Sequence, residues 1–284
     1  MNRENKPIRV YEATGARLGV LSSLALAGRE LYSARHVIWR LFVRDFVAGF
    51  RQRLLGFLWV FLAPLLGIAS FIFMQQIGVL NPGRTAIPYP IYVYIGTSVW
   101  GLLLGALTNV AGGLIGNADL VIRTNIPKIA FAVTGMATIC YGLLVNLLVL
   151  LLLLWWFGLP PSPWAVFYPL AVLPILLLGV GFGLFLAVVG AVARDITGMF
   201  TTVLGLVMYL TPVVYATDFP NPVLKAITRW NPLTYLVDAP RSLFVLGRIT
   251  DPMRYAWSSL ACVLVLIAGL HAFYLIKDKA AERL

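Results

Sequence analysis

The amino-acid sequence predicts an all-α integral membrane protein with six transmembrane helices, and three observations lead to this class. Hydrophobic residues make up 60% of the chain and charged residues 12%, whereas an average soluble domain has roughly 45–50% and about 25%. Long apolar runs alternate with short polar segments, and about 20 apolar residues can cross the hydrocarbon core of a bilayer. Lys and Arg gather in alternate polar segments, as they do in the cytoplasmic loops of membrane proteins.

Six apolar runs have the required length, because each lacks Lys, Arg, Asp and Glu except close to its ends. The predicted spans are about 54–80, 91–115, 132–159, 164–193, 197–217 and 256–276. Sixteen of the 22 Lys and Arg residues fall before the first span, in the second and fourth loops, or after the last span. Because cytoplasmic loops carry the excess of cations, both termini are predicted to be cytoplasmic.

The apolar segment 18–28 imitates a secretory signal, since it follows cationic residues and ends in Ala25-Leu26-Ala27. Cleavage there would place the cations of the following segment outside, against the charge bias. We therefore expect a retained cytoplasmic helix within an N-terminal extension of residues 1–32. A transmembrane domain of residues 33–276 and a cytoplasmic tail of residues 277–284 are predicted to follow.

Residues 33–55 are predicted to form a different kind of helix from the spans. On a helical wheel Arg40, Arg44 and Arg51 lie on one side, and aromatic and aliphatic side chains occupy the other. This pattern is typical of an amphipathic helix in the membrane interface, with cations toward anionic headgroups and apolar side chains toward acyl chains. A plain anchor beside the membrane has the same pattern.

Residues 218–255, before the last span, are too polar to cross a membrane, yet apolar residues recur in them at near-helical spacing. Pro232 interrupts the pattern after Trp230 and Asn231, because the residue before a proline is disfavoured in a helix. The segment, which also contains Arg241, is predicted to form a hairpin of two short re-entrant helices. Irregular backbone at membrane depth is tolerated where protein buries it or where it lines a water-filled cavity, so the hairpin suggests the mouth of a pathway.

Two spans carry, on one helical face, side chains that are suited to lining a conduit. The face on the first span comprises Phe57, Phe61, Ile68, Phe71 and Gln75, and the face on the fifth comprises Thr201, Gly205, Met208, Pro212 and Tyr215. Aromatic rings stack on the C–H faces of sugars, so these faces suit a glycan, although ordinary helix packing and interfacial belts give the same pattern. Three glycine pairs have the spacing that permits close helix contact, namely Gly101–Gly105, Gly112–Gly116 and Gly179–Gly183.

Two polar segments fall on the side that is predicted to be cytoplasmic. Residues 117–131 are rich in charged and amide side chains, which suit a plain turn or a docking surface for a soluble partner, and composition alone favours the turn. Ala193, Arg194 and Asp195 form the other turn. There Arg194 suits the end of one helix, and Asp195 is placed to cap the next.

The sequence lacks the motifs of an enzyme or of a self-powered transporter. It contains no phosphate-binding loop, no GxSxG or HExxH motif and no long soluble segment. No carboxylate or Lys lies at the centre of a span, where ion-coupled transporters usually carry one. A transporter with these properties needs a partner that supplies energy.

No metal site is predicted, because the two histidines and the two cysteines have no partners at ligand spacing. The net charge of +11 is expected to face anionic lipid rather than nucleic acid, since no basic run alternates with aromatic residues in a polar segment.

Three segments resemble the type-2 ATP-binding-cassette exporter permeases. They are RDFVAGFRQRLLGFLWVFLAPLL (Arg44–Leu66), DLVIRTNIPKIAF (Asp119–Phe131) and LTPVVYATDFPNPVLKAITRWNPLTYLVDAPRSLFVLG (Leu210–Gly247). The resemblance extends over residues 33–276 and points to the branch that exports polysaccharides and polyol phosphates, which includes O-antigen and teichoic-acid exporters.

The resemblance implies a permease subunit without catalytic residues, which forms a homodimer and binds two copies of a separate ATPase subunit. ATP and Mg would bind to that subunit, and this chain would bind no cofactor. The coupling residues would be Asp119, Arg123, Thr124, Asn125, Pro127 and Lys128, with Arg194 and Asp195 in a second contact. The conduit for a lipid-linked polysaccharide would run between the first and fifth spans of the two copies, in the cytoplasmic (inner) membrane.

Two other functions stay open at this point. An exporter of drugs or of a lipo-oligosaccharide shares the fold and the segment Asn231–Thr234. An integral membrane enzyme acting on polyprenyl-linked glycans is a different class, and the missing carboxylate or His cluster argues against it.

Overall fold

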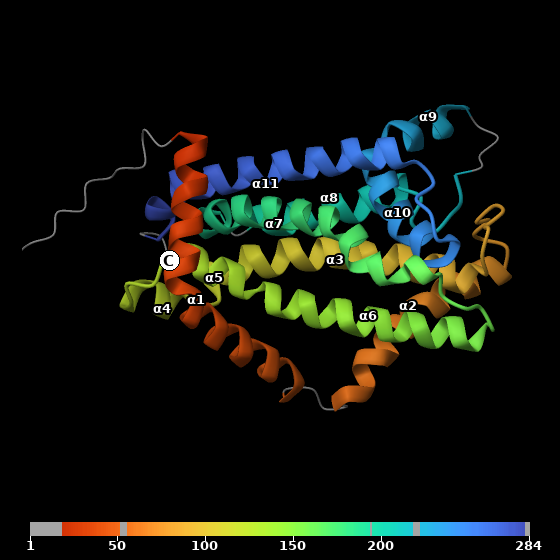
Figure 1. The fold of residues 1–284 in the computed structure, drawn as a ribbon, viewed down its shortest axis with the longest axis horizontal. Helices are drawn as coiled ribbons and strands as arrows, with labels where there is room; N and C mark the ends of the chain where they lie inside the picture. Colours follow the sequence, from red (N-terminus) through yellow and green to blue (C-terminus); the bar gives the residue numbers. More distant parts are fainter. Residues whose placement is uncertain (1–18, 52–55, 194, 218–221, 282–284) are drawn as a thin grey trace, which may run out of the picture.

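Long helices run side by side along the longest axis of the molecule, and a further helix crosses one end of them (Figure 1). The computed structural model describes residues 19–51, 56–193, 195–217 and 222–281, with the side chains of 48–51, 56–60, 191 and 278–281 excepted. Within these ranges the chain forms α-helices, one 3-10 helix and no strand. The predicted all-α class is therefore confirmed for the described residues.

The central helix is α7 (Tyr168–Val192), which packs against α3 (Tyr89–Ile115) on one side and α11 (Pro252–Ala281) on the other (Figure 1). Small residues allow this close approach. A Cβ added at Gly179 would lie 2.6 Å from Ala106 Cβ of α3, and one at Gly183 would lie 2.7 Å from Val110 Cβ. The Gly179–Gly183 pair thus makes the close helix contact that its spacing predicts. By contrast, an added Cβ at Gly101 or Gly112 would meet nothing within 4 Å.

The helix α6 (Met136–Trp156) packs on the other side of α3, and the short α5 (Lys128–Thr134) precedes it. Gly135 separates the two helices at a point where an added Cβ would lie 2.5 Å from Asn109 O. The hydroxyl of Tyr94 in α3 donates to Asn146 O in α6 over 3.0 Å. The predicted third span, 132–159, therefore corresponds to two consecutive helices with a break at this glycine.

The helix α1 (Val20–Arg51) runs without interruption through the boundary that the sequence placed between residues 32 and 33. Its first half packs on the end of α11. There Ser23 Oγ lies 3.0 Å from His271 Nδ1, and Glu30 accepts hydrogen bonds from Tyr274 at 2.7 Å and from Lys277 at 3.0 Å. The later part of the predicted extension is thus packed against the bundle, whereas residues 1–18 lie outside the described part of the chain.

Four helical segments of the described residues are long and apolar enough to cross a membrane: Tyr89–Ile115, Lys128–Trp156, Pro163–Gly190 and Pro252–Lys277. Two further apolar stretches, Phe61–Gln76 and Asp195–Leu210, are shorter. They belong to α2 (Gly56–Gln76) and α8 (Asp195–Leu210). The count of six spans accordingly stays a prediction.

Several helices begin or end at other residues than the predicted spans. The helix α2 ends four residues before the predicted end of the first span, and Gly78 follows it with a φ of 77° that favours glycine. The helix α8 ends at Leu210, seven residues before the predicted end of the fifth span. The 3-10 helix η2 (Pro163–Phe167) begins the fourth, and α11 extends beyond both predicted ends of the sixth.

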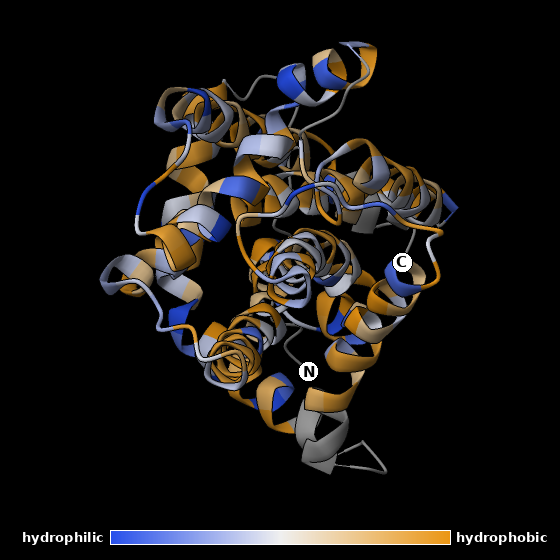
Figure 2. Cartoon of the chain, turned by 90° about the vertical axis from the view of Figure 1, so that its right-hand side faces the viewer, coloured by the Kyte–Doolittle hydropathy of each residue, from blue (hydrophilic) through white to orange (hydrophobic). Residues whose placement is uncertain are grey.

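The predicted hairpin consists of α9 (Pro222–Trp230) and α10 (Pro232–Leu246), which are separated at Asn231 as the sequence indicates. Asn231 caps α10, because its Oδ1 accepts a hydrogen bond from Leu233 N over 3.0 Å. Seen from this end of the bundle, apolar residues cover the flanks of the long helices, and α9 at the top is hydrophilic along one side (Figure 2). We call this end the α10 end, and the opposite one, which carries α4 (Ala118–Arg123), the α4 end.

The contact between α7 and α11 leaves no room for a side chain at Gly181, where an added Cβ would lie 2.8 Å from the Leu266 backbone. We expect Gly181→Ala to lower stability by about 1–3 kcal/mol, because backbone atoms of a packed helix cannot give way. The melting temperature of the purified chain in neutral detergent measures this. Gly101→Ala is the matched control, since it adds the same methyl group in open space. Equal melting temperatures for the two variants would contradict the packing argument.

Candidate functional site

The polar groups of the molecule gather at its two ends. At the α4 end, Asp119, Arg123 and Asn125 are exposed, whereas Thr124, Pro127 and Lys128 are half-buried. The Thr124 hydroxyl donates to Leu120 O over 2.6 Å, and Lys128 Nζ donates to Lys277 O over 3.4 Å. Of the six predicted coupling residues in this loop, three are therefore half-buried in it and three are exposed.

The outward side of α4 combines charge with an apolar side chain. Ile122, which precedes the exposed Arg123 on α4, is 63% exposed. The helix α4 therefore presents an apolar side chain as well as charged ones at its surface. This residue was not among the predicted coupling residues, although its place in a polar loop was a visible signal.

The helix α1 is joined to the α4 end through Arg44. Its Nη2 donates to Asn117 Oδ1 over 3.0 Å, and its Nε pairs with Asp45 at 2.7 Å. Asn117 Nδ2 in turn donates to Gly113 O at the end of α3 over 2.9 Å. Arg44 thus links α1 to the α3–α4 turn, whereas Arg40 is exposed and the side chain of Arg51 lies outside the described residues.

The other predicted contact, Arg194 and Asp195, lies at the same end of the bundle. Gly179 meets α3 beside Leu103, and Gly183 meets it beside Leu107. The helices α3 and α7 therefore run in the same direction, and the turn after α7 falls on the side of α4. Asp195 begins α8 and is exposed, and Arg194 lies outside the described residues. The structure brings Asp195 to this end without a hydrogen bond or ion pair to α4 among the described residues.

At the α10 end the chain leaves α8 and runs irregularly from Thr211 to Ala216. Arg241 of α10, which is only 4% exposed, holds this segment. Its Nη2 donates to Val213 O over 2.9 Å, and both terminal nitrogens lie 3.3 Å from Pro212 O. The guanidinium also stacks on the ring of Tyr92, with Cζ 3.6 Å from the ring centroid.

Three further hydrogen bonds hold the same segment, two of them through its backbone groups and one through a side chain. Tyr92 OH donates to Tyr215 O over 2.9 Å, Ala216 N donates to Pro82 O over 2.7 Å, and Asn231 Nδ2 donates to Thr211 Oγ1 over 2.9 Å. Irregular backbone among apolar helices is stable when protein groups satisfy it in this way.

Gly96 makes the approach between α3 and this segment possible. An added Cβ there would overlap Val213 O at 2.2 Å and lie 2.5 Å from the Arg241 guanidinium. Sequence reasoning placed Arg241 in the hairpin but found neither its contact with the irregular segment nor Tyr92 and Gly96. The aromatic run Tyr92–Tyr94 followed by a glycine was the available signal, and nothing in it specifies a cation as the partner.

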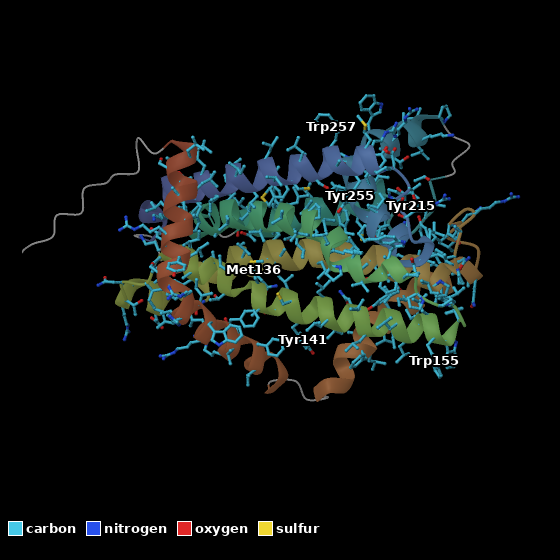
Figure 3. All side chains as sticks on the ribbon, viewed as in Figure 1. Met136, Tyr141, Trp155, Tyr215, Tyr255 and Trp257 are labelled. Carbon is cyan, nitrogen blue, oxygen red and sulfur yellow. The ribbon has the colours of Figure 1, made fainter. Side chains whose placement is uncertain are left out.

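Only part of the predicted conduit face of the fifth span lies on one helix. Thr201 and Met208 lie in α8 and are half-buried, but Pro212 and Tyr215 follow the end of that helix and do not share its face. Tyr215 OH donates to Tyr209 O over 2.7 Å, and Figure 3 shows its side chain at the α10 end. The helix ends at Leu210, just before Thr211 and Pro212, because the residue before a proline is disfavoured in a helix. Arg241 then donates to the carbonyls of Pro212 and Val213.

The predicted face of the first span packs inward within this chain. Ile68 is 4% exposed, and Phe61 and Phe71 are half-buried against the hydrophobic core. Gln75 is half-buried, and the side chain of Phe57 lies outside the described residues. The packing alternative thus accounts for Phe61, Ile68 and Phe71 in the isolated chain, and a lining role stays a prediction.

These features define a multi-pass helical membrane protein whose polar groups lie at the two ends of its bundle. Among the described residues, no group of three or more His, Cys, Asp and Glu side chains lies close enough together to hold a metal ion. The chain belongs to the ABC-2 type transporter family, whose model matches residues 36–245.

Its relatives include two O-antigen export system permease proteins, both named RfbA. The protein from Klebsiella pneumoniae is 24% identical over 244 residues, which cover 84% of this chain and 91% of the relative. The protein from Myxococcus xanthus is 24% identical over 257 residues, which cover 89% of this chain and 97% of the relative. The resemblance that the three sequence segments suggested is thereby confirmed.

The contacts of Arg241 lead to a stability prediction. Arg241→Gln leaves the carbonyls of Pro212 and Val213 without their donors, so we expect a loss of about 3 kcal/mol. Arg241→Lys should recover only part of this, because an ammonium group cannot serve both carbonyls and stack on Tyr92 as a planar guanidinium does. Thermal unfolding in detergent measures both. Arg248→Gln removes an exposed cation at the same end and should change stability by less than about 0.5 kcal/mol. A loss of equal size at both positions would argue against the assigned role of Arg241.

Proposed function

We propose that this chain is the membrane permease subunit of an ATP-driven exporter that moves a lipid-linked polysaccharide across the cytoplasmic membrane. Family membership over residues 36–245 is the observation that carries the proposal. Two further facts support it: relatives that span most of the chain are named as O-antigen export permeases, and the sequence has no phosphate-binding loop of its own. ATP and Mg would accordingly bind to a separate ATPase subunit rather than to this chain.

The α4 end is the proposed docking surface for that ATPase. Asp119, Ile122 and Arg123 offer exposed charged and apolar groups on one short helix. This helix follows α3 directly and is tied to α1 by the hydrogen bond from Arg44 to Asn117. A force applied to α4 therefore acts on two helices at once, and Asp195 adds a second exposed charge at the same end.

The proposed arrangement in the membrane has six spans, with α2 and α8 as the first and fifth, and both termini in the cytoplasm. Two copies of the chain would form a dimer with a conduit between their α2 and α8 helices. Apolar side chains that this chain leaves exposed support such a partner surface, notably Leu66 and Phe73 on α2 and Val203 and Leu206 on α8. The helices α9 and α10 would re-enter the membrane on the outer side.

Charge reversal at the docking surface tests the coupling role. Arg123→Glu should abolish the appearance of polysaccharide at the cell surface, because like charges placed opposite each other at an interface cost several kcal/mol. Membrane abundance and dimer formation should persist, since Arg123 makes no hydrogen bond or ion pair to another described residue. Arg123→Lys preserves the charge and serves as the control. Normal export by the Glu variant would show that α4 only reverses the chain and is not a docking surface.

Cysteine labelling tests the topology. The background is a chain in which Cys140→Ser and Cys262→Ala remove the native thiols. We expect Asn81→Cys and Ile227→Cys to react with a membrane-impermeant maleimide on intact cells, whereas Thr124→Cys should react only after the cells are opened. Reaction at Thr124→Cys on intact cells would falsify the six-span arrangement.

A further inference from the structure

A cavity of about 470 Å³ lies at the α10 end, between the loop before α3, the segment after α8 and the helices α9, α10 and α11. Five cationic side chains line it: Arg84, Lys225, Arg229, Arg241 and Arg254. They come from four separate parts of the chain, so the fold itself gathers them. A concentration of positive charge in one cavity indicates an anionic ligand.

Among the described residues, two carboxylates line the same cavity, and each has a cationic neighbour. Asp251 pairs with Arg254 at 3.4 Å and also accepts the Arg254 backbone N–H at 3.1 Å, and Asp238 lies 3.9 Å from Arg241. Arg84, Lys225 and Arg229 have no ion pair within the described part of the chain. Three cations thus line the cavity without a counter-ion among the described residues.

Three of the hydroxyl groups that line the cavity already donate within the protein. Thr228 donates to Leu224 O, Thr234 donates to Thr228 O over 2.8 Å, and Ser242 donates to Asp238 O over 2.9 Å. The charged donors that line the cavity are guanidinium and ammonium groups. These are the groups that bind phosphate most strongly, through charge-assisted hydrogen bonds.

A groove of about 770 Å³ adjoins this cavity between α9 and α11 and shares Lys225 and Arg229 with it. Its other side chains include Trp230 and Trp257, which are 86% and 62% exposed. Figure 3 shows Trp257 directed away from the bundle, beside α9. Exposed Trp side chains on a membrane protein are typical of the headgroup level of the bilayer. The cavity and the groove together form a site with a cationic half and an aromatic, apolar half.

We infer that this site binds a lipid with a diphosphate headgroup, with the diphosphate in the cationic cavity and the first part of the hydrocarbon chain along the Trp230–Trp257 groove. The three uncompensated cations match the two to three negative charges of a diphosphate better than the single charge of a common phospholipid. The inference rests on the proposed function for the origin of this lipid, as the anchor of the exported polymer. Its position on the outer side makes it a site where the anchor is held after crossing.

The test uses the purified full-length chain in neutral detergent and geranylgeranyl diphosphate as the probe, with bound lipid counted by native mass spectrometry. Geranylgeraniol has the same hydrocarbon chain without phosphate, and phosphatidylglycerol carries one phosphate. We expect geranylgeranyl diphosphate to bind more tightly than either. Inorganic pyrophosphate should compete with it, because the cavity recognises the headgroup.

The variant Lys225→Gln with Arg229→Gln should weaken binding of the diphosphate lipid about tenfold, since two charge-assisted contacts are lost. Arg248→Gln removes an exposed cation that does not line the cavity and should leave binding unchanged. Arg84→Gln, on the opposite wall, should weaken binding even if the double variant is unstable. Equal binding of geranylgeraniol or phosphatidylglycerol, or binding that the cavity variants do not weaken, would overturn the inference. The binding assay needs neither an ATPase nor transport. If the chain binds the diphosphate lipid but export is absent, the result counts against the proposed function and not against the binding site.

Discussion

The buried guanidinium of Arg241 is the interaction on which the α10 end depends. The chain after α8 does not continue as a helix, so its carbonyls need donors in a region surrounded by apolar side chains. Arg241 supplies them to Pro212 and Val213, and its charge is further stabilised by the face of the Tyr92 ring. One side chain of α10 therefore contacts both the segment after α8 and α3.

A different constraint acts on the long helices. Glycines at their contacts allow the helices to approach closely. Without water between helices in a bilayer, association depends on close packing rather than on the hydrophobic effect. Gly181 and Gly269 meet so closely that an added Cβ at Gly269 would lie 2.0 Å from Gly181 O. Since α7 meets α3 and α11 in this way, the three helices have few alternative registers, and the shorter helices pack around a rigid centre.

The sequence predicts the elements that depend on local pattern and misses those that depend on distant contacts. Apolar runs predict the long helices, and Asn231-Pro232 marks the break between α9 and α10. The apolar run continues through Val214, but Pro212 is a local signal for the end of α8 at Leu210, because the residue before a proline is disfavoured in a helix. The sequence does not show that Arg241, 28 or more residues away, donates to the carbonyls that follow. The packing of the first half of α1 on α11 could not be predicted from local pattern, since it involves contacts such as Glu30 with Lys277 across the fold.

Of the candidate site residues, those in short polar turns could be placed from the sequence, because a polar turn between apolar helices has to lie at an end of the bundle. Asp119 and Arg123 are exposed there, and Asp195 begins α8 at the same end. The conduit residues could not be placed in this way. Residues share a helical face only if they lie in the same helix. Because α8 ends at Leu210, Tyr215 does not lie on the predicted face.

The helix α3 connects the two ends of the molecule, which gives its sequence a double role. At one end Gly113 and the adjoining Asn117 tie it to α1 and α4, and at the other Tyr92 and Gly96 hold it against Arg241. Its 27 residues span about 40 Å at 1.5 Å per residue, the full depth of a bilayer with its headgroups. A straight, packed helix transmits a displacement along its axis with little loss. Movement of α4 would therefore reach the irregular segment after α8 through a single element, where the hydrogen bonds of Arg241 and Tyr92 are the contacts that such a movement would strain first.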